Sequence, residues 1–498
     1  MKLTPSLPVP LSRTLLSKPL RAPLLAALLT ALLADSKLAL AADAAALQEV
    51  SVNASRIALT GIADSATEGV VGAAQLANRP LLRTAEVLET VPGMIVTQHS
   101  GDGKANQYFL RGYNLDHGSD FATFVQGMPV NVVSHAHGQG YMDMNFLIPE
   151  LIDHIQYRKG VYAAPDGDFT NTGSARIAYQ RRLAAPFVDL TLGEHSFRRA
   201  LAAGGTEWNG FDLLGAVELG GNDGPWDQPG NLHKRNAVAR LSKGGANNGF
   251  SVTAMAYEAD WTATEHVPER AITGGEIKRF GALTPSDGGR THRYSLAGEW
   301  AASGAAGASR INAYVVDYAL NYFAAPSGFI QGAQGDQHEQ ADRRVTWGGE
   351  ARHAVDLGVV DLTLGAQLRQ DRIGTLGLYE TVERVRTATV REDEATETAA
   401  GLFAEARRDW TPWLRSTLGL RYDRIRAKTV ATGGAFNMAN GGRAEAGQTS
   451  PKAGLVFGPF GKQSAELYLN WGRGFHSNDA RGATSTVQPT DGAPADKL

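Results

Sequence analysis

Residues 361–369 read Asp-Leu-Thr-Leu-Gly-Ala-Gln-Leu-Arg, and their pattern recurs through the second half of the chain. Apolar and polar side chains alternate one by one, which is typical of a β-strand with one apolar face and one polar face. Residues 211–220 and 414–423 alternate in the same way, and the charged residues of each stretch share a single face. We therefore predict strands whose charged faces point inward, to water.

The connections between these stretches alternate in length. A soluble β-sandwich also contains alternating strands, but it gives no reason for short and long connections to follow one another strictly. An outer-membrane β-barrel does, because it has short periplasmic turns and long extracellular loops. We therefore expect an all-β membrane barrel over residues 187–498. The tight links lie near 204–210, 244–249, 303–309, 356–358, 410–412 and 459–462, and the long ones near 221–233, 261–292, 321–344, 372–396 and 427–449.

The number of strands predicts an incomplete barrel. We count about 13 candidate strands, whereas bacterial single-chain barrels close with an even number and the largest transporters have about 22. An odd count leaves residues 475–498 as the start of an extracellular loop, and residues 494–498 form no closing strand. We expect a truncated chain, a fragment with two open edges that would not insert stably in lipid.

The N-terminus has the features of a secretory signal peptide. Arg13, Lys18 and Arg21 precede an apolar run over residues 22–33, and small residues follow at 39–41. A transmembrane helix is the alternative, but about 13 apolar residues fall short of the roughly 20 that cross a bilayer. We predict a signal peptide over residues 1–41 and a mature protein in the outer membrane of a Gram-negative bacterium.

Composition excludes several classes of function. The chain of 498 residues has no cysteine and balances 48 basic against 51 acidic side chains. It therefore has no disulfide, zinc-thiolate site or cysteine nucleophile, and nucleic acid is not an expected partner. No serine elbow or paired zincin histidines occur, and residues 101–104 lack the spacing of a phosphate-binding loop. We expect no enzyme activity and no cofactor.

Residues 65–180 leave the barrel pattern and form an expected α+β domain of their own. Its motifs resemble, in order, those of the plug of TonB-dependent outer-membrane receptors, and the resemblance runs from about residue 47 to the end of the chain. Gln126 stands where the family often has aspartate, and Lys159 where it often has arginine. The motifs are Val-Leu-Glu-Thr-Val-Pro-Gly at 87–93, Phe-Leu-Arg-Gly at 109–112, Val-Gln-Gly-Met-Pro-Val at 125–130 and Ile-Gln-Tyr-Arg-Lys-Gly-Val-Tyr-Ala at 155–163.

The resemblance implies a TonB box within the linker at residues 42–64. Such a box is an extended peptide that pairs with an edge strand of TonB, so backbone hydrogen bonds supply the affinity. An ordinary flexible N-terminus is the alternative. The resemblance also makes TonB and its inner-membrane energising complex the expected partners. The candidate box consists of Leu47, Gln48, Glu49, Val50, Ser51, Val52, Asn53 and Ala54.

The stretch 131–145 is a candidate ligand-binding loop at the plug apex. His135 and His137 have a spacing of two, as do Met142 and Met144, so in extended backbone each pair projects to one side. Imidazole with thioether suits copper, and the two histidines alone suit zinc. Contact with an organic ligand or a chelate explains the loop equally well. The expected ligand-binding residues are His99, His117, His135, His137, Tyr141, Met142 and Met144.

Arg111 and Arg158 are candidates for seating the plug. Each is expected either to form a buried ion pair with a carboxylate of the barrel wall or to remain a solvated strand arginine.

The resemblance implies an active importer of a scarce nutrient, with a ferric siderophore as the default substrate. A free copper or zinc ion, cobalamin or a saccharide are the alternatives within transport, and a passive porin or a barrel enzyme are alternatives from other classes. The expected partners are TonB, outer-membrane lipid and the small-molecule or metal-chelate ligand, and the full-length protein is expected to be a monomer.

Overall fold

A computed structural model describes residues 59–99, 101–263, 265–325, 336–462 and 464–495. The predicted signal peptide, residues 1–41, and the TonB-box candidate, residues 47–54, lie outside these residues. Within the described part of the chain, no helix combines the length and apolar character needed to cross a membrane.

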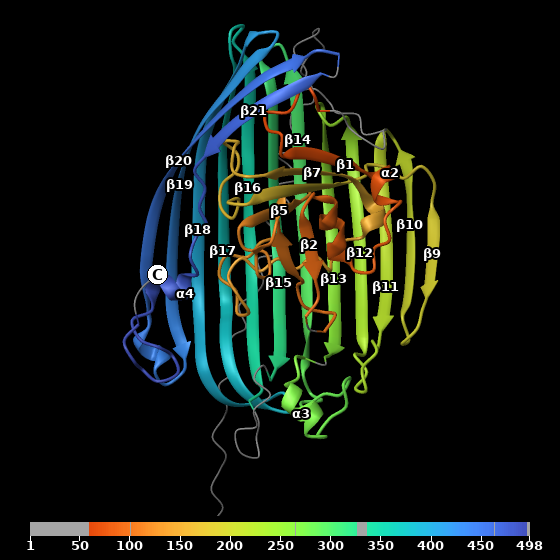
Figure 1. Cartoon of the computed structure of the whole chain (residues 1–498), viewed down its shortest axis with the longest axis vertical. Helices are drawn as coiled ribbons and strands as arrows, with labels where there is room; N and C mark the ends of the chain where they lie inside the picture. Colours follow the sequence, from red (N-terminus) through yellow and green to blue (C-terminus); the bar gives the residue numbers. More distant parts are fainter. Residues whose placement is uncertain (1–58, 100, 264, 326–335, 463, 496–498) are drawn as a thin grey trace, which may run out of the picture. The chain divides into compact units, whose positions relative to one another are not determined.

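The second part of the chain is a single antiparallel sheet of 13 strands, in which each strand pairs with the next one along the chain. Figure 1 shows the strands side by side, from β9 in yellow to β21 in blue. The sheet is not closed, because β9 and β21 are its two edges. The predicted all-β wall of about 13 strands is confirmed. The strands are β9 (Phe187–Leu192), β10 (Arg198–Trp208), β11 (Phe211–Asn222), β12 (Leu232–Gly244), β13 (Gly249–Thr262), β14 (Gly288–Gly304), β15 (Gly307–Ala324), β16 (His338–Asp356), β17 (Asp361–Val382), β18 (Val385–Thr411), β19 (Leu414–Gly433), β20 (Gly441–Phe460) and β21 (Ala465–Gly472).

The two faces of the sheet differ as the alternation predicts. Val217 and Leu418 are 54% and 62% exposed on the outer face, whereas Glu218 and Arg421, on the same two strands, are 2% and 3% exposed on the inner face. An outer face with this many exposed apolar side chains suits contact with lipid. Exposed tryptophans beside the short turns form an aromatic girdle at that end of the strands. They are Trp208, Trp300, Trp410 and Trp413.

Two predicted long loops are wrong in extent. Strands β17 and β18 continue through residues 372–396 and meet in a two-residue turn, Glu383 and Arg384, both with positive φ. Strands β19 and β20 shorten the predicted loop at 427–449 to residues 434–440. In the distal part of β17 the apolar-out alternation is lost, because Ile373, Leu376 and Tyr379 are buried while Arg372 and Glu380 are exposed, yet the backbones still pair. The pairing of β17 with β18 also shifts register three times, which further obscures the period.

The plug forms two small sheets. Strands β1 (Glu68–Gly72), β7 (Ile152–Lys159), β8 (Gly173–Tyr179), β5 (Phe121–Val125) and β6 (Met128–Pro129) make one, and β2 (Met94–Thr97), β3 (Gln107–Leu110) and β4 (Tyr113–Asn114) make the other. The plug also contains a 3-10 helix, η1 (Thr84–Thr90), preceded by the short helix α2 (Ala73–Leu76). The motif glycines 93, 112, 127 and 160 all have positive φ. A Cβ on Gly160 would also lie 2.4 Å from the ring of Tyr162, so this turn requires glycine.

Arginines on the inner face of the wall hold the plug. Arg369 donates to the carbonyl oxygen of Asn131 at 2.8 Å, and its guanidinium is fixed by Asp371, two residues along the same strand, at 2.6 Å. Because residues i and i+2 of a strand share a face, both charges point inward and pair there. We call these Arg–Asp pairs the wall dyads. There are two other wall dyads. In one, Arg344 pairs with Asp342 and donates to the carbonyl of Ser134; in the other, Arg421 pairs with Asp423 and donates to the carbonyl of Pro165.

The predicted seating arginines of the plug act differently. The carboxylates that pair with Arg158, Glu68 at 3.1 Å and Asp166 at 3.0 Å, belong to the plug rather than to the barrel wall. Arg111 is exposed in a turn with φ +54° and forms no ion pair among the described residues. Arg158 thus pairs within the plug, with the wall carboxylate of Glu405 close enough to interact with its charge, and Arg111 corresponds to the alternative of a solvated arginine. Wall side chains bind the plug backbone in both directions: wall arginines donate to plug carbonyls, and Glu405 accepts from the N–H of Ala164.

The segment after β21, predicted as the start of an extracellular loop, forms no further named strand among its described residues. It folds onto the plug apex, where it forms helix α4 (Ala480–Thr484). The backbone N–H of Ala480 donates to Ser134 Oγ at 2.7 Å, and Arg481 donates to the carbonyl of His135 at 2.7 Å. Polar groups of this segment thus find their partners on the plug.

We expect Leu418→Arg to weaken the folded barrel by about 2–4 kcal/mol, because it places a charge on the lipid-facing surface. The folded fraction in a series of urea concentrations, read from heat-modifiable migration on a gel, measures this loss. The matched control is Leu357→Arg, which changes a leucine of similar exposure, 57%, in the short turn before β17. An equal loss in both variants would contradict the assignment of the outer face.

We expect Arg344→Met to destabilise the plug by about 3–5 kcal/mol, because it leaves the buried carboxylate of Asp342 and the carbonyl of Ser134 without their donor. Thermal unfolding and protease cleavage within the plug report the change. Arg343→Met is the control, since its exposed side chain forms no ion pair among the described residues; its effect should stay within about 0.5 kcal/mol. Similar behaviour of the two variants would show that the dyad does not seat the plug.

Candidate functional site

Four histidines form a row between the plug and a barrel connection. His99 lies after β2, His117 after β4 and His137 in the loop after β6, while His266 belongs to the connection between β13 and β14. The ring centroids of His266 and His99 are 5.2 Å apart, those of His99 and His117 5.1 Å, and those of His117 and His137 4.6 Å. We call these four residues the histidine row. The row joins segments that are far apart in the sequence.

The imidazoles from the plug are neutral at pH 7. Burial, with the nearby charge of Lys104, lowers the pKa of His117 to about 4. The same two causes hold the pKa of His137 well below its ordinary value and lower the pKa of His99. Neutral imidazole keeps one unprotonated nitrogen, which is the form that accepts a hydrogen bond or ligates a metal.

Both signs of charge flank the row. Lys104 is buried, with Nζ 3.4 Å from the hydroxyl of Tyr322, and burial lowers its pKa. The carboxylate of Asp116 is 3.8 Å from Nε2 of His117, and burial raises the pKa of Glu265, which lies close enough to Lys104 to interact with its charge. Two carboxylates thus face one ammonium, so the surroundings do not repel a cation.

Two polar atoms at the row lack partners. His99 Nδ1 and Glu265 Oε1 are buried without a hydrogen bond to any described residue. As the side chains stand, however, the described residues contain no group of three or more histidines, aspartates and glutamates arranged to hold a metal ion. The site therefore offers atoms with free lone pairs that could bind a metal, but the described side chains alone do not form a complete coordination shell.

His135 is separate from the row. The loop bends at residues 133–138 instead of running extended, so His135 and His137 point to different partners. The ring of His135 stacks on Tyr141 at 4.0 Å, its Nε2 lies 3.0 Å from the hydroxyl of Tyr318, and its Nδ1 accepts from the backbone N–H of His137. Both ring nitrogens are occupied, so the side chain anchors the loop.

The remaining predicted residues are buried. Met142 and Met144 are 0% and 1% exposed and belong to the hydrophobic core of the plug, as does Tyr141. The predicted pairing of imidazoles with thioethers is therefore not formed. Among the predicted residues, the structure brings together His99, His117 and His137. Sequence reasoning missed His266, Asp116, Lys104 and Gln340, and no motif marks them, because they join the site only through the fold.

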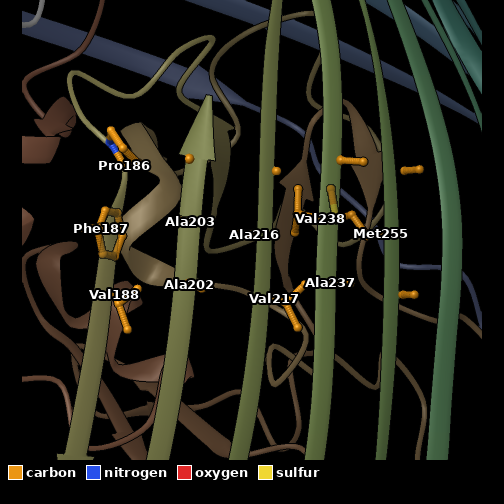
Figure 2. A pocket seen from close by; sticks show the side chains of 15 residues that line it. Pro186, Phe187, Val188, Ala202, Ala203, Ala216, Val217, Ala237, Val238 and Met255 are labelled. Atoms are coloured by element: carbon orange, nitrogen blue, oxygen red, sulfur yellow. The ribbon is translucent and has the colours of Figure 1, made fainter. Parts of the chain in front are cut away.

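A separate apolar hollow of about 920 Å³ lies over β9 to β13 (Figure 2). Figure 2 shows Phe187 and Val188 on one side and Ala216, Val238 and Met255 on the neighbouring strands. None of its lining residues has a polar side chain. It therefore offers nothing that would orient a polar ligand, and the histidine row remains the candidate site.

The fold and its parts match known proteins. Residues 63–174 match the model of the TonB-dependent receptor plug domain, and residues 220–496 match that of the TonB dependent receptor-like β-barrel. Similar solved structures include the ferric citrate transporter FecA in its unliganded form (14% identity, 83% of this chain and 63% of that chain, TM-score 0.67). The ferric yersiniabactin uptake receptor FyuA from Yersinia pestis (13%, 78% and 62%, TM-score 0.62) and the copper transporter OprC (15%, 83% and 63%, TM-score 0.60) are others.

At these identities the structural likeness shows the fold alone, and the chain spans about 62–63% of the length of these three proteins. The two family models cover most of the chain between them, and the barrel model alone covers more than half. The chain belongs to the TonB-dependent receptors, a family of outer-membrane β-barrels with a plug domain.

Proposed function

We propose that this receptor actively imports a metal-bearing nutrient and that the histidine row contacts the ligand. The observation that carries the proposal is the row itself, because neutral imidazoles, one of which has an unsatisfied nitrogen, meet at the side of the plug that a long connection covers. The similar structures support the choice of a metal-bearing ligand, since they are a ferric citrate transporter, a ferric yersiniabactin receptor and a copper transporter. A ferric siderophore is the default within this class, and a free metal ion is the alternative.

Residues 61–64 lie between the TonB-box candidate and the plug, where work from TonB would be transmitted. Side chains of the wall hold the backbone of this segment, an arrangement that we call the wall clasp. Arg415 donates to the carbonyl of Ala63 at 2.6 Å, and Asn470 donates to that of Asp64 at 2.8 Å. The other clasp contacts are Arg407 to the carbonyl of Ile62 at 3.4 Å and the N–H of Gly61 to Glu466 at 3.2 Å.

Work from TonB would be applied to the segment that the clasp holds. Ligand binding favours exposure of the TonB box only if the two states of the plug differ in ligand affinity. A passive porin is opposed by the plug, because the wall dyads seat it against the inner face at several points. A barrel enzyme is opposed by the absence of a nucleophile motif in the sequence.

We expect deletion of residues 47–54 from the chromosomal gene to abolish uptake while ligand binding by the purified receptor stays intact, because the deletion removes the strand that pairs with TonB. Uptake is measured with radiolabelled iron and zinc supplied in the spent medium of the same strain. The control is a tonB-deleted strain with the unaltered receptor, which should lose uptake equally. Uptake that persists after deletion of the box but stops without TonB would place the box elsewhere.

A further inference from the structure

His117 has a fixed tautomer. Its Nδ1 is 3.1 Å from the carbonyl oxygen of Ala105 and 3.0 Å from that of Asn106. Because a carbonyl oxygen only accepts, Nδ1 carries the proton, and Nε2 presents its lone pair. A hydrogen bond from the second ring nitrogen to a carbonyl is also how proteins orient histidines that ligate metals.

His137 presents its lone pair to the same point. Its Nδ1 is 2.6 Å from Oε1 of Gln340, which places the proton on Nδ1 and leaves Nε2 free. The Nε2 atoms of His117 and His137 are 3.0 Å apart. Two lone pairs that face each other at this distance repel, so the arrangement calls for a positive centre between them.

The spacing suits a metal ion. With metal–nitrogen bonds of about 2.05 Å, two nitrogens 3.0 Å apart subtend an angle of about 94° at the metal. This is close to the right angle between neighbouring ligands of an octahedral or square-planar ion. The carboxylate of Asp116, 3.8 Å from Nε2 of His117, is the nearest further ligand.

We infer that His117 and His137 form a two-nitrogen binding site for a divalent transition-metal ion, whose remaining positions are filled by its carrier or by water. The inference rests on the proposed function and narrows its substrate class. Imidazole favours zinc, copper, nickel or cobalt, whereas an ion that prefers oxygen ligands would find a single nearby carboxylate. Two protein nitrogens fill only part of the coordination shell of such an ion, which suits an ion that is already bound to other ligands.

The competing explanation is a rotated amide. If the amide of Gln340 is turned, its nitrogen donates to His137 Nδ1, and His137 Nε2–H then donates to His117 Nε2. This closes a hydrogen-bond chain without a metal. Binding of Zn²⁺ by the unaltered protein separates the two explanations, because the hydrogen-bond chain protonates Nε2 of His137 and uses the lone pair of His117 Nε2. Gln340→Glu holds the proton on Nδ1 of His137 in either case, since a carboxylate only accepts.

The experiment measures binding of Zn²⁺ alone by calorimetry, and of Co²⁺ alone by visible absorption, to receptor purified from native outer membranes with an affinity tag that lacks histidine. We expect His117→Gln and His137→Gln each to weaken Zn²⁺ binding by at least about tenfold. His154→Gln, which changes a plug histidine paired with Asp153 outside the row, should bind like the unaltered protein. Gln340→Glu should bind about tenfold more tightly, a gain that a folding defect does not produce.

The inference is overturned if the two row variants bind Zn²⁺ like the His154 control, or if Gln340→Glu binds no more tightly than the unaltered protein. Its failure is distinct from failure of the proposed function. If the receptor binds no Zn²⁺ but uptake still requires residues 47–54, the metal-site inference is wrong and the proposed importer function stands. If the receptor binds Zn²⁺ but no strain takes up iron or zinc, the proposed importer function is wrong and the metal-site inference stands.

Discussion

The structure depends on one arrangement, a guanidinium on the inner face of the wall that donates to a backbone carbonyl of the plug. The plug presents carbonyls that need donors, and the wall must bury charges that need partners. A strand places residues i and i+2 on the same face, so Arg369 and Asp371 meet both needs together. The carboxylate neutralises the charge of the arginine and orients its guanidinium, which donates a hydrogen bond to a carbonyl of the plug. Repetition of the dyad along β16, β17 and β19 seats the apex loop and the segment near Pro165 against one continuous surface.

The position of the histidine row follows from these contacts between the wall dyads and the plug. Arg344 holds the carbonyl of Ser134, and the next residue, His135, is locked between Tyr141 and Tyr318. The chain then bends, and its next imidazole, His137, turns onto His117. A histidine that ligates nothing thus determines where the following histidine points. For this reason the spacing of two between His135 and His137 marks an anchor and a site residue, rather than two ligands of the same kind.

The sequence predicts the features that are local along the chain. Period-two alternation gives the strands, their faces and their number, because each residue's face depends only on its position in its own strand. Alternation fails in the distal part of β17 and β18, where the pairing shifts register and apolar residues such as Ile373 and Leu376 are buried. The site is harder to predict, since Gln340 reaches His137 across 203 residues and Tyr318 reaches His135 across 183. The pattern Arg-x-Asp at 369–371 and 421–423 is visible in the sequence, but only the sheet shows that both residues face the plug.

The same strands support the plug at both of its ends. On β18, Glu397 accepts from Ser134 at the apex, and Arg407 donates to Ile62 in the clasp. Ten residues separate these two side chains, which is about 33 Å along a strand. A strand paired on both sides within a 13-stranded sheet is a rigid frame, so the distance between apex and clasp along the wall is fixed. A change at the apex therefore reaches the clasp by movement of the plug relative to the frame, and the dyad bonds to plug carbonyls set the free energy of that movement. In the proposed importer, coupling to the TonB-box candidate requires a ligand whose affinity differs between the two states of the plug.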